Sequence, residues 1–526
     1  MVELSGQRNA HKGVLIVHFG AQYCQLIARR VRELSVFSEI CTPDQASKAL
    51  ASGRYGAIIL SGGPRSVYEA DAPRLDAGVL DFGLPLLGIC YGMQWATKAL
   101  GGEVVRAQDN AGREYGSATL EVGDDAGPLF SGVPTKSQVW MSHGDEVRSL
   151  PRGFRRVAST SSCREAAAWD PERRIALLQF HPEVAHTLEG EVLLRNFVFE
   201  VAGLAADWNP GSIIDETIAA LRAQIGDEGE VVLGLSGGVD SSVAALLIHR
   251  AIGARLHCVF VDNGLLRHGE RQAVEALFGR NFAMNLEVVD ASEQFLADLR
   301  GVTEPETKRK RIGHRFVEVF REAAKKHAHA RFLGQGTLYP DVIESVAAHG
   351  GATSTIKSHH NVGGLPKDLD MELVEPLRTL FKDEVRAIGR SMGLPPEVID
   401  RQPFPGPGLG VRILGEVTKE ACFVLRQADH IFTTEVEAAG LEKRLWQYFA
   451  VLLPVRSVGV MGDGRTYEQP IVLRVVESND AMTADWSYLP EGLLRRVSQR
   501  IINEVEGVNR VVLDITSKPP GTIEWE

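Results

Sequence analysis

The chain has 526 residues, of which 44% are hydrophobic and 24% are charged, a composition typical of folded globular proteins. Lys and Arg number 57 against 68 Asp and Glu, so the net charge of −11 argues against nucleic acid or an anionic membrane as a partner. No apolar run reaches the roughly 18 residues of a membrane helix, and the N-terminal residues carry no secretion signal. Six scattered cysteines match neither a disulfide scaffold nor a zinc motif, so we expect a soluble, cytoplasmic protein.

The first part of the chain alternates apolar strands with amphipathic helices. We expect strands at residues 14–20, 55–63 and 84–90, and a helix at 25–34 whose apolar residues recur at helical spacing. A turn-forming cluster, Asp-Trp-Asn-Pro-Gly at 207–211, ends this part. The alternation predicts a parallel, doubly wound α/β sheet.

The same rhythm starts again after the turn, and it predicts a second parallel α/β sheet. Residues 402–410 (QPFPGPGLG) then form a Pro- and Gly-rich break that fits neither a helix nor a central strand. The last stretch has both helical and strand-like pieces, which indicates a smaller α+β unit. The expected domains are 12–207, 208–401 and 402–526.

Cys90 stands at a sharp turn between a buried strand and a helix, in the pattern Gly88-Ile-Cys90-Tyr91-Gly92. This pattern is typical of a nucleophile elbow with sulfur in place of the serine oxygen. The positive end of the helix favours a thiolate. The amide of Tyr91 is a natural oxyanion donor, and a second donor is expected from one of the glycines that end an upstream strand. These two glycines are Gly62 and Gly63.

A base for the thiol is expected from His181-Pro-Glu183, which follows an apolar strand. Pro182 disfavours a helix at His181. In an extended segment residues i and i+2 project to one side, so Glu183 can orient the imidazole of His181. A buried core cysteine and a chance His-Pro-Glu are the alternatives, but the combination with the elbow glycines favours catalysis.

Together these motifs make residues 12–207 resemble the class I glutamine amidotransferases. The resemblance implies a flavodoxin-like fold and a thioester formed by Cys90 on the side-chain amide of glutamine, with release of ammonia. It also implies that further residues hold the glutamine. These are Gln94, His143, Gly144 and Asp145.

A second motif, SGGVDSS, follows the apolar strand at 231–235 and opens a helix. Glycine amides, hydroxyls and a helix N-terminus favour an anion site, and the motif lacks the Gly-Lys of a Walker loop. Asp240 would repel phosphate unless a cation intervened, which indicates Mg²⁺. An ordinary Gly/Ser turn is the alternative. The motif residues are Ser236, Gly237, Gly238, Val239, Asp240, Ser241 and Ser242.

SGGVDSS resembles the pyrophosphate loop of the N-type ATP pyrophosphatases, which have an adenine nucleotide α-hydrolase-like fold. The resemblance implies ATP as a substrate that is split to AMP and pyrophosphate. It further implies a phosphate contact from Lys382 and an adenine pocket lined by Val261 and Phe316.

Over nearly its full length the chain resembles the glutamine-hydrolysing GMP synthases, on the segments 404–409, 458–465 and 518–526. The resemblance implies glutamine, ATP and xanthosine monophosphate (XMP) as substrates, and a homodimer formed through the last domain. The implied XMP contacts are Arg309, Asp463, Gln469, Lys518 and Glu524.

Two other interpretations stay open at this point. One is an enzyme with the same two chemistries and another acceptor, as in the NAD synthetases, and the other is a nucleotide-binding regulator with a relic triad. The basic run 308–311 is expected to be mostly solvated, and the C-terminal tail is expected to pack back into a site. Adjacent His359 and His360 predict no metal site, because neighbouring residues rarely bind one ion. The segment 349–364 is expected to be a lid or a plain loop.

Overall fold

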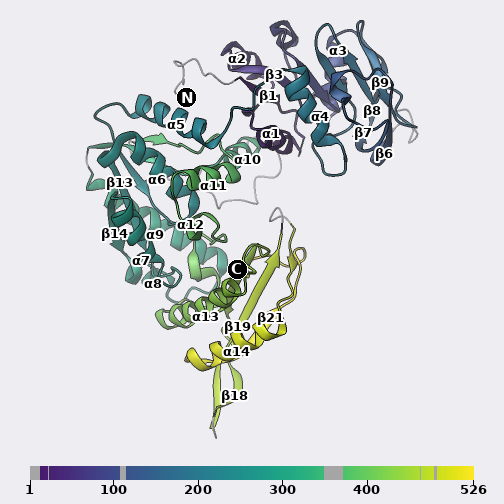
Figure 1. The fold of residues 1–526 in the computed structure, drawn as a ribbon. Coiled ribbons are helices and arrows are strands. Elements are labelled where there is room, and N and C mark those ends of the chain that lie inside the picture. Colours follow the sequence, from purple (N-terminus) through teal and green to yellow (C-terminus); the bar gives the residue numbers. More distant parts are fainter. Residues whose placement is uncertain are drawn as a thin grey trace. The chain divides into compact units, whose positions relative to one another are not determined.

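The computed structural model describes residues 12–21, 23–106, 114–327, 329–348, 371–461, 464–478 and 483–526. Its contacts divide the chain into two compact units, Met1–Ile213 and Ile214–Glu526, and Figure 1 shows the elements of each. Asp463 and the segment 349–364 with its His pair lie outside the described residues.

The first unit is built on a nine-stranded sheet in the order β2-β1-β3-β4-β11-β10-β9-β6-β7. The five strands from β2 to β11 are parallel, which confirms the predicted α/β class, whereas β10, β9, β6 and β7 pair antiparallel. The antiparallel extension was not predicted. Buried and exposed residues alternate only weakly along these strands, as in β6, so the sequence gives a weak strand signal there. The strands are β1 (Gly13–Val17), β2 (Ser38–Cys41), β3 (Tyr55–Leu60), β4 (Leu86–Ile89), β6 (Glu114–Val122), β7 (Lys136–His143), β9 (Arg155–Ser159), β10 (Ala167–Asp170) and β11 (Ile175–Leu178), and β5 (Glu103–Arg106) pairs with β8 (Asp145–Ser149) separately.

Helices α1 and α2 connect parallel strands of this sheet. Because β1 lies between β2 and β3, right-handed crossovers place α1 and α2 on opposite faces of the sheet. Strands β3, β4 and β11 are neighbours, so the residues after their carboxyl ends meet at one edge. The helices are α1 (Cys24–Glu33), α2 (Ala46–Ala51), α3 (Tyr91–Ala99) and α4 (Gly190–Asn196).

The second unit opens with a fully parallel sheet in the order β14-β13-β12-β15-β16. Strand β12 lies between β13 and β15, so the loop after β12 sits where the strand order reverses, the usual place of a ligand site in such sheets. The strands are β12 (Glu230–Gly234), β13 (Leu256–Asp262), β14 (Asn285–Asp290), β15 (Ala330–Gly334) and β16 (Glu372–Val374). The helices are α5 (Pro210–Ile225), α6 (Val239–Ile252), α7 (Glu270–Val274), α8 (Ser292–Leu299), α9 (Pro305–Lys325), α10 (Tyr339–Ala348), α11 (Lys382–Ser391) and α12 (Pro396–Ile399).

A mixed sheet with two helices completes the chain, which confirms the predicted α+β class of this part. The long strand β19 pairs antiparallel with β17, β18 and β20 and parallel with β21. One hydrophobic core runs from β12 and β13 through α9 to α13, β17 and α14, so it is continuous across residue 402. The predicted boundary at 402 stays a prediction. The elements are α13 (Lys419–Ala438), β17 (Gln447–Leu452), β18 (Ser457–Met461), β19 (Gly464–Glu477), β20 (Asp485–Trp486), α14 (Glu491–Glu504) and β21 (Val508–Asp514).

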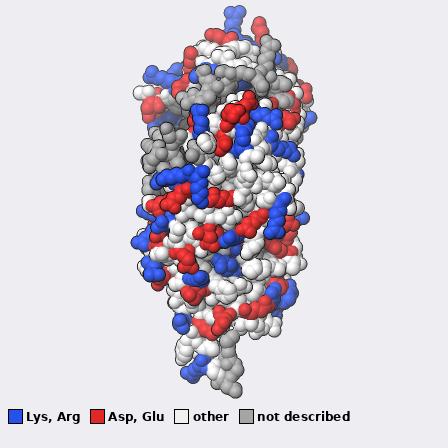
Figure 2. Space-filling view, turned by 90° about the vertical axis from the view of Figure 1, so that its left-hand side faces the viewer, with Lys and Arg blue, Asp and Glu red and all other residues white. Residues whose placement is uncertain are grey.

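Acidic and basic side chains are interspersed on the face that Figure 2 shows. Within the described ranges, no helix combines the length and the apolar character that crossing a membrane requires.

Candidate functional site

Cys90 occupies the predicted elbow between β4 and α3. Its φ is +50°, in the left-handed region that a non-glycine residue rarely adopts, and it caps the N-terminus of α3. Gly92 in the first turn leaves no room for a side chain, because a Cβ there would lie 2.4 Å from the carbonyl oxygen of Leu60. The helix can therefore approach β3 closely only with glycine at this position.

His181 follows β11, the neighbour of β4, and reaches the same edge of the sheet as Cys90. Its Nδ1 lies 2.7 Å from Oε1 of Glu183, and both side chains are buried. A Cβ on Gly62 would lie 2.8 Å from Cε1 of His181 and 3.7 Å from Cβ of Cys90. The structure thus brings Gly62, Cys90 and the imidazole together.

The electrostatics of this group favour a charged imidazole. Burial lowers the pKa of His181, but the Glu183 carboxylate and hydrogen bonds to Cys90 and Glu183 outweigh burial and hold this pKa well above its usual range. The thiol of Cys90 also donates to the carbonyl oxygen of Ser142, at 3.5 Å. An imidazolium beside a thiol stabilises the thiolate, which is the nucleophilic form.

Three backbone amides at the elbow have no hydrogen-bond partner within the described part of the chain. They belong to Gly62, Gly63 and Tyr91. The predicted oxyanion donors, Tyr91 and one of the two glycines, are among them, and their role stays a prediction.

The predicted glutamine-binding residues lie in the same unit, but three of them, Gln94, His143 and Asp145, are buried. The amide of Gln94 donates to the carbonyl oxygen of Asp145 at 3.0 Å, and the side chain of Asp145 accepts from Ser66. The ring of His143 turns toward Glu114, with Nε2 and Oε2 3.6 Å apart. Gln94 therefore fixes the backbone at 145, while a direct contact of these residues with glutamine stays a prediction.

The SGGVDSS segment follows β12 and enters α6, as predicted. Gly237 has a φ of +75°, and the hydroxyls of Ser236 and Ser241 lie 2.9 Å apart. Ser241 and Ser242 also donate to the carbonyl oxygen of Gly238, at 3.1 and 2.7 Å. Because Ser242 is fully buried, its hydroxyl supports the loop from inside. The loop is a compact turn whose amides precede the N-terminus of a helix of 14 residues.

Lys382 begins α11 and reaches the phosphate loop from a distant part of the sequence. Its Nζ lies 2.6 and 2.5 Å from the two carboxylate oxygens of Asp240. Gly336, after β15, packs against the same turn, since a Cβ there would lie 3.2 Å from the carbonyl carbon of Asp240. The structure thus brings the predicted lysine and the predicted metal carboxylate to one point.

The two predicted adenine contacts share one core. Val261 is buried in β13, and Phe316 on α9 packs against the same hydrophobic cluster and stacks on Phe320 at 6.5 Å between ring centroids. Both side chains thus belong to the apolar core beside β13, and a contact with adenine stays a prediction.

Two of the predicted XMP residues, Lys518 and Glu524, lie in the C-terminal tail. Arg309 donates to the main-chain oxygen of Glu526, and the Glu524 carboxylate accepts from Arg412 and Gln447, which lie outside the tail. Gln469 instead donates to the carbonyl oxygen of Leu453 at 2.8 Å, which gives it a backbone-holding role. Lys518 pairs through its backbone with Ala484, at 2.7 and 3.0 Å.

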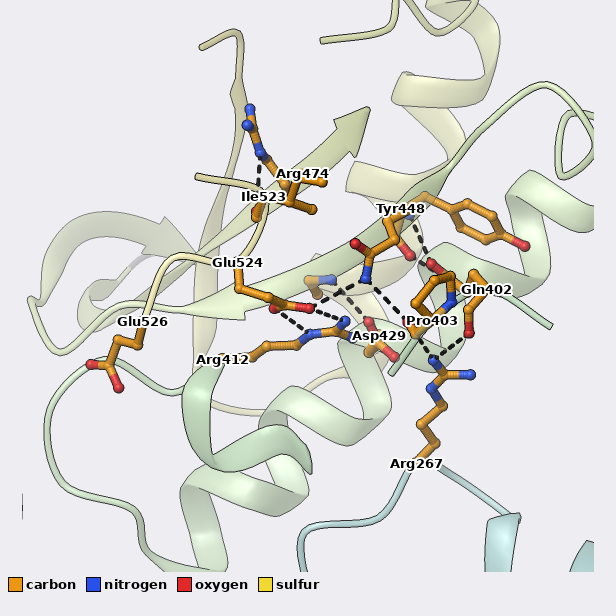
Figure 3. A network of polar contacts seen from close by, with 12 residues as sticks. Arg267, Gln402, Pro403, Arg412, Asp429, Tyr448, Arg474, Ile523, Glu524 and Glu526 are labelled. Carbon is orange, nitrogen blue, oxygen red and sulfur yellow. Dashed lines mark hydrogen bonds and ion pairs between the residues drawn. The ribbon is translucent and has the colours of Figure 1, made fainter. Parts of the chain in front are cut away.

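Buried cations hold the tail, and the sequence analysis missed them. The guanidinium of Arg412, fully buried, donates to both carboxylate oxygens of Glu524 at 3.1 and 2.9 Å (Figure 3). Arg474 donates to the carbonyl oxygens of Ile523 and Thr522, at 3.4 and 3.0 Å. Arg412 lies two residues after the Pro- and Gly-rich segment 402–410, but nothing in the sequence around it predicted its burial.

The tail packs back as expected, and its last residue reaches the basic run 308–311. Ile523 is buried, but Trp525 stays 37% exposed and donates through Nε1 to Asp514 at 2.9 Å. In the basic run 308–311, Lys308 is fully buried against the carbonyl oxygen of Ile413 and the Glu526 carboxylate, so it is not solvated. The sequence signal for this burial was a charged residue on the apolar face of α9.

Three family models match successive segments of the chain. The glutamine amidotransferase class-I model matches residues 15–201, the NAD synthase model 213–312 and the GMP synthase C-terminal domain model 434–525. Proteins named glutamine-hydrolysing GMP synthase are similar over 98% of this chain: 58% identity in Thermomicrobium roseum (96% of that protein), 55% in Maridesulfovibrio salexigens (99%) and 55% in Streptomyces coelicolor (98%). Among solved structures, a glutamine amidotransferase from Thermotoga maritima covers 37% of this chain and 99% of its own at 22% identity and a TM-score of 0.30. The full-length relatives favour the GMP synthase interpretation over the NAD synthetase alternative.

Proposed function

Because the chain belongs to the family of glutamine-hydrolysing GMP synthases, we propose that it aminates XMP at C2 to give GMP, using glutamine and ATP. The observation that carries this conclusion is an identity of 58% that extends over 98% of the chain and 96% of the relative. Two separate sites support it: the Cys90, His181 and Glu183 group, and the glycine-rich loop before α6.

In the glutaminase reaction, the Cys90 thiolate attacks the side-chain amide carbon of glutamine. The amide of Tyr91 and the amide of Gly62 or Gly63 stabilise the oxyanion, and the His181 imidazolium gives its proton to the departing nitrogen as ammonia leaves. His181 then takes a proton from water, which cleaves the thioester to glutamate and restores the thiolate. Glu183 keeps the imidazole oriented through Nδ1 at 2.7 Å. Gln94, His143, Gly144 and Asp145 form the wall for the glutamine.

In the synthetase reaction, O2 of XMP attacks the α-phosphorus of ATP, and pyrophosphate leaves. Ammonia then attacks C2 of the adenylated base, and AMP leaves to give GMP. Residues 236–242 and Lys382 bind the β- and γ-phosphates, with adenine against Val261 and Phe316. The XMP site comprises Arg309, Asp463, Gln469, Lys518 and Glu524.

Asp240 fits a magnesium ion. Its carboxylate is about one-third exposed beside the phosphate loop, and Mg²⁺ commonly binds one or two carboxylates together with substrate phosphates. When bound, the ion neutralises charge on the pyrophosphate group. The contact with Lys382 holds the Asp240 side chain at the loop.

The variant Cys90→Ala tests the division between the two sites. It is expected to lose GMP formation from glutamine and to keep GMP formation from ammonium at the wild-type rate. Loss of both reactions in a folded protein would contradict the division, because the ammonium reaction needs no thiol. Alanine is chosen over serine for this design, because a hydroxyl in place of the thiol could retain weak nucleophilic activity.

The chain is further proposed to act in the cytoplasm as a homodimer. All six cysteines are free and buried, which suits a reducing compartment. The hairpin of β18 and β19 exposes Val458, Val460 and Tyr467 by 52%, 73% and 55%, and such apolar patches often serve subunit contacts. Light scattering after size-exclusion chromatography would give twice the mass of 57.4 kDa, and the monomer mass would contradict the dimer.

A further inference from the structure

Three side chains of the first unit form a cluster next to the glutaminase group. Glu114 begins β6 and pairs across the antiparallel ladder with His143 at the end of β7. Cys163 lies in the turn between β9 and β10. One donor atom from each of Glu114, His143 and Cys163 lies within 4.8 Å of the others. No step of the proposed reaction uses Glu114 or Cys163.

The contacts of His143 show which of its two ring nitrogens carries the proton and which one faces the cluster. Nδ1 lies 3.1 Å from the carbonyl oxygen of Asp145, and a carbonyl oxygen can only accept, so Nδ1 carries the proton. Nε2 is buried, has no hydrogen-bond partner within the described residues, and faces Oε2 of Glu114 at 3.6 Å. A lone pair therefore faces a carboxylate, and a cation between them would satisfy both.

The other two donors have surroundings that suit metal ligands. The Glu114 carboxylate accepts from the hydroxyls of Thr160 and Ser162, at 3.3 and 2.6 Å, which fixes its direction. Cys163 is 2% exposed, so its sulfur faces the cluster and not the solvent. A bound metal ion would replace the thiol proton.

We propose that Glu114, His143 and Cys163 form a three-ligand site for one Zn²⁺-class transition-metal ion. Zinc bond lengths of about 2.0–2.3 Å in a tetrahedron separate oxygen and nitrogen ligands by roughly 3.4 Å, close to the observed 3.6 Å. The ligand set combines carboxylate, imidazole and thiolate, and a water molecule fills the fourth position. Binding forms a metal–sulfur bond and releases the thiol proton of Cys163 to solvent.

The site has a structural consequence for the glutaminase. His143 directly follows Ser142, whose carbonyl oxygen accepts from the Cys90 thiol, and precedes the segment that Gln94 holds. A metal ion would tie the end of β7 to β6 and to the turn that carries Cys163. It is thus a support for the wall of the glutamine site and lies outside the reacting atoms.

Cobalt titration tests the site in the full-length Cys90→Ala protein, where the catalytic thiol cannot bind metal. After treatment with a chelator, we expect one Co²⁺ per chain with a thiolate-to-cobalt charge-transfer band, displaced by one equivalent of Zn²⁺. Adding Cys163→Ser should remove the band and weaken binding at least about 10-fold. The control Cys258→Ser replaces another buried cysteine, which lies in β13, and should leave the band unchanged.

Three results would overturn the proposal: a folded Cys90→Ala protein without the band, a band that persists with Cys163→Ser, or a band lost equally with Cys258→Ser. Circular dichroism identifies variants that fail to fold. If Cys163→Ser fails, Glu114→Gln takes its place and should weaken Co²⁺ binding while it retains the thiolate band. Unchanged Co²⁺ affinity of that variant would also contradict the site.

Discussion

The variant Glu183→Gln isolates the contribution of charge behind the Cys90 thiol. The carboxylate of Glu183 has no exposed surface, and its Oε1 lies 2.7 Å from Nδ1 of a His181 ring that is 6% exposed. Gln keeps the size and an acceptor oxygen but removes the charge that holds the pKa of His181 high. A hydrogen bond to a charged group contributes about 1.5–3 kcal/mol, which corresponds to roughly a 10- to 150-fold change in rate.

We therefore expect kcat/KM for glutamine to fall by about 10- to 150-fold. The pKa of His181 is raised in the folded protein, so the imidazolium persists as the pH rises toward that pKa and is lost above it. In Glu183→Gln this pKa falls, and the high-pH limb of the glutaminase profile should move to lower pH. Release of glutamate at several pH values, measured in a coupled assay, gives both quantities.

The matched control is the same variant supplied with ammonium. Its rate of GMP formation should equal that of the wild type, because the second reaction does not use His181. Glutamine kinetics within twofold of the wild type, or an unmoved high-pH limb, would refute the role assigned to Glu183. An equal loss with ammonium would show a folding defect instead of a catalytic one.

Three more changes test the fold and the second site. Gly92→Ala should lower the free energy of unfolding by about 1–3 kcal/mol, and with it the melting temperature, because the new Cβ would lie 2.4 Å from the Leu60 carbonyl oxygen. An unchanged melting curve would contradict this packing. Removal of Glu526 leaves the buried ammonium of Lys308 without its carboxylate. Breaking a buried ion pair lowers the free energy of unfolding by about 3–5 kcal/mol, which calorimetry should detect. An unchanged free energy of unfolding would show that the fold does not depend on this contact of the tail. Lys382→Met should raise KM for ATP in the ammonium reaction and leave glutamine hydrolysis alone, whereas an unchanged KM would remove this lysine from the phosphate site.

The elements that carry chemistry could be predicted because each has a strong local signal. Cys90 needs glycines around a sharp turn, and the phosphate loop needs a Gly/Ser run between an apolar strand and a helix, so both motifs specify their own geometry. The parallel strands next to them are continuous apolar runs, as in β3, which is buried at every position. Local sequence was sufficient for these parts.

The antiparallel extension of the first sheet and the buried cations depend on long-range pairing. Arg412 and Glu524 are 112 residues apart, and Lys308 and Glu526 are 218 residues apart, so no sequence window contains either pair. A lone Arg or Lys is normally exposed, and burial follows only from a partner that the fold supplies. The cluster of Glu114, His143 and Cys163 could not be predicted either, because two strands and a turn far apart in the sequence bring it together.

Product analysis tests the central claim most directly. The purified protein is incubated with Mg-ATP and glutamine, and with either XMP or deamido-NAD as acceptor, and the nucleotides are separated by chromatography. We expect GMP, AMP and pyrophosphate in equal amounts with XMP, and no AMP with deamido-NAD. AMP formed with deamido-NAD and no GMP formed with XMP would contradict it.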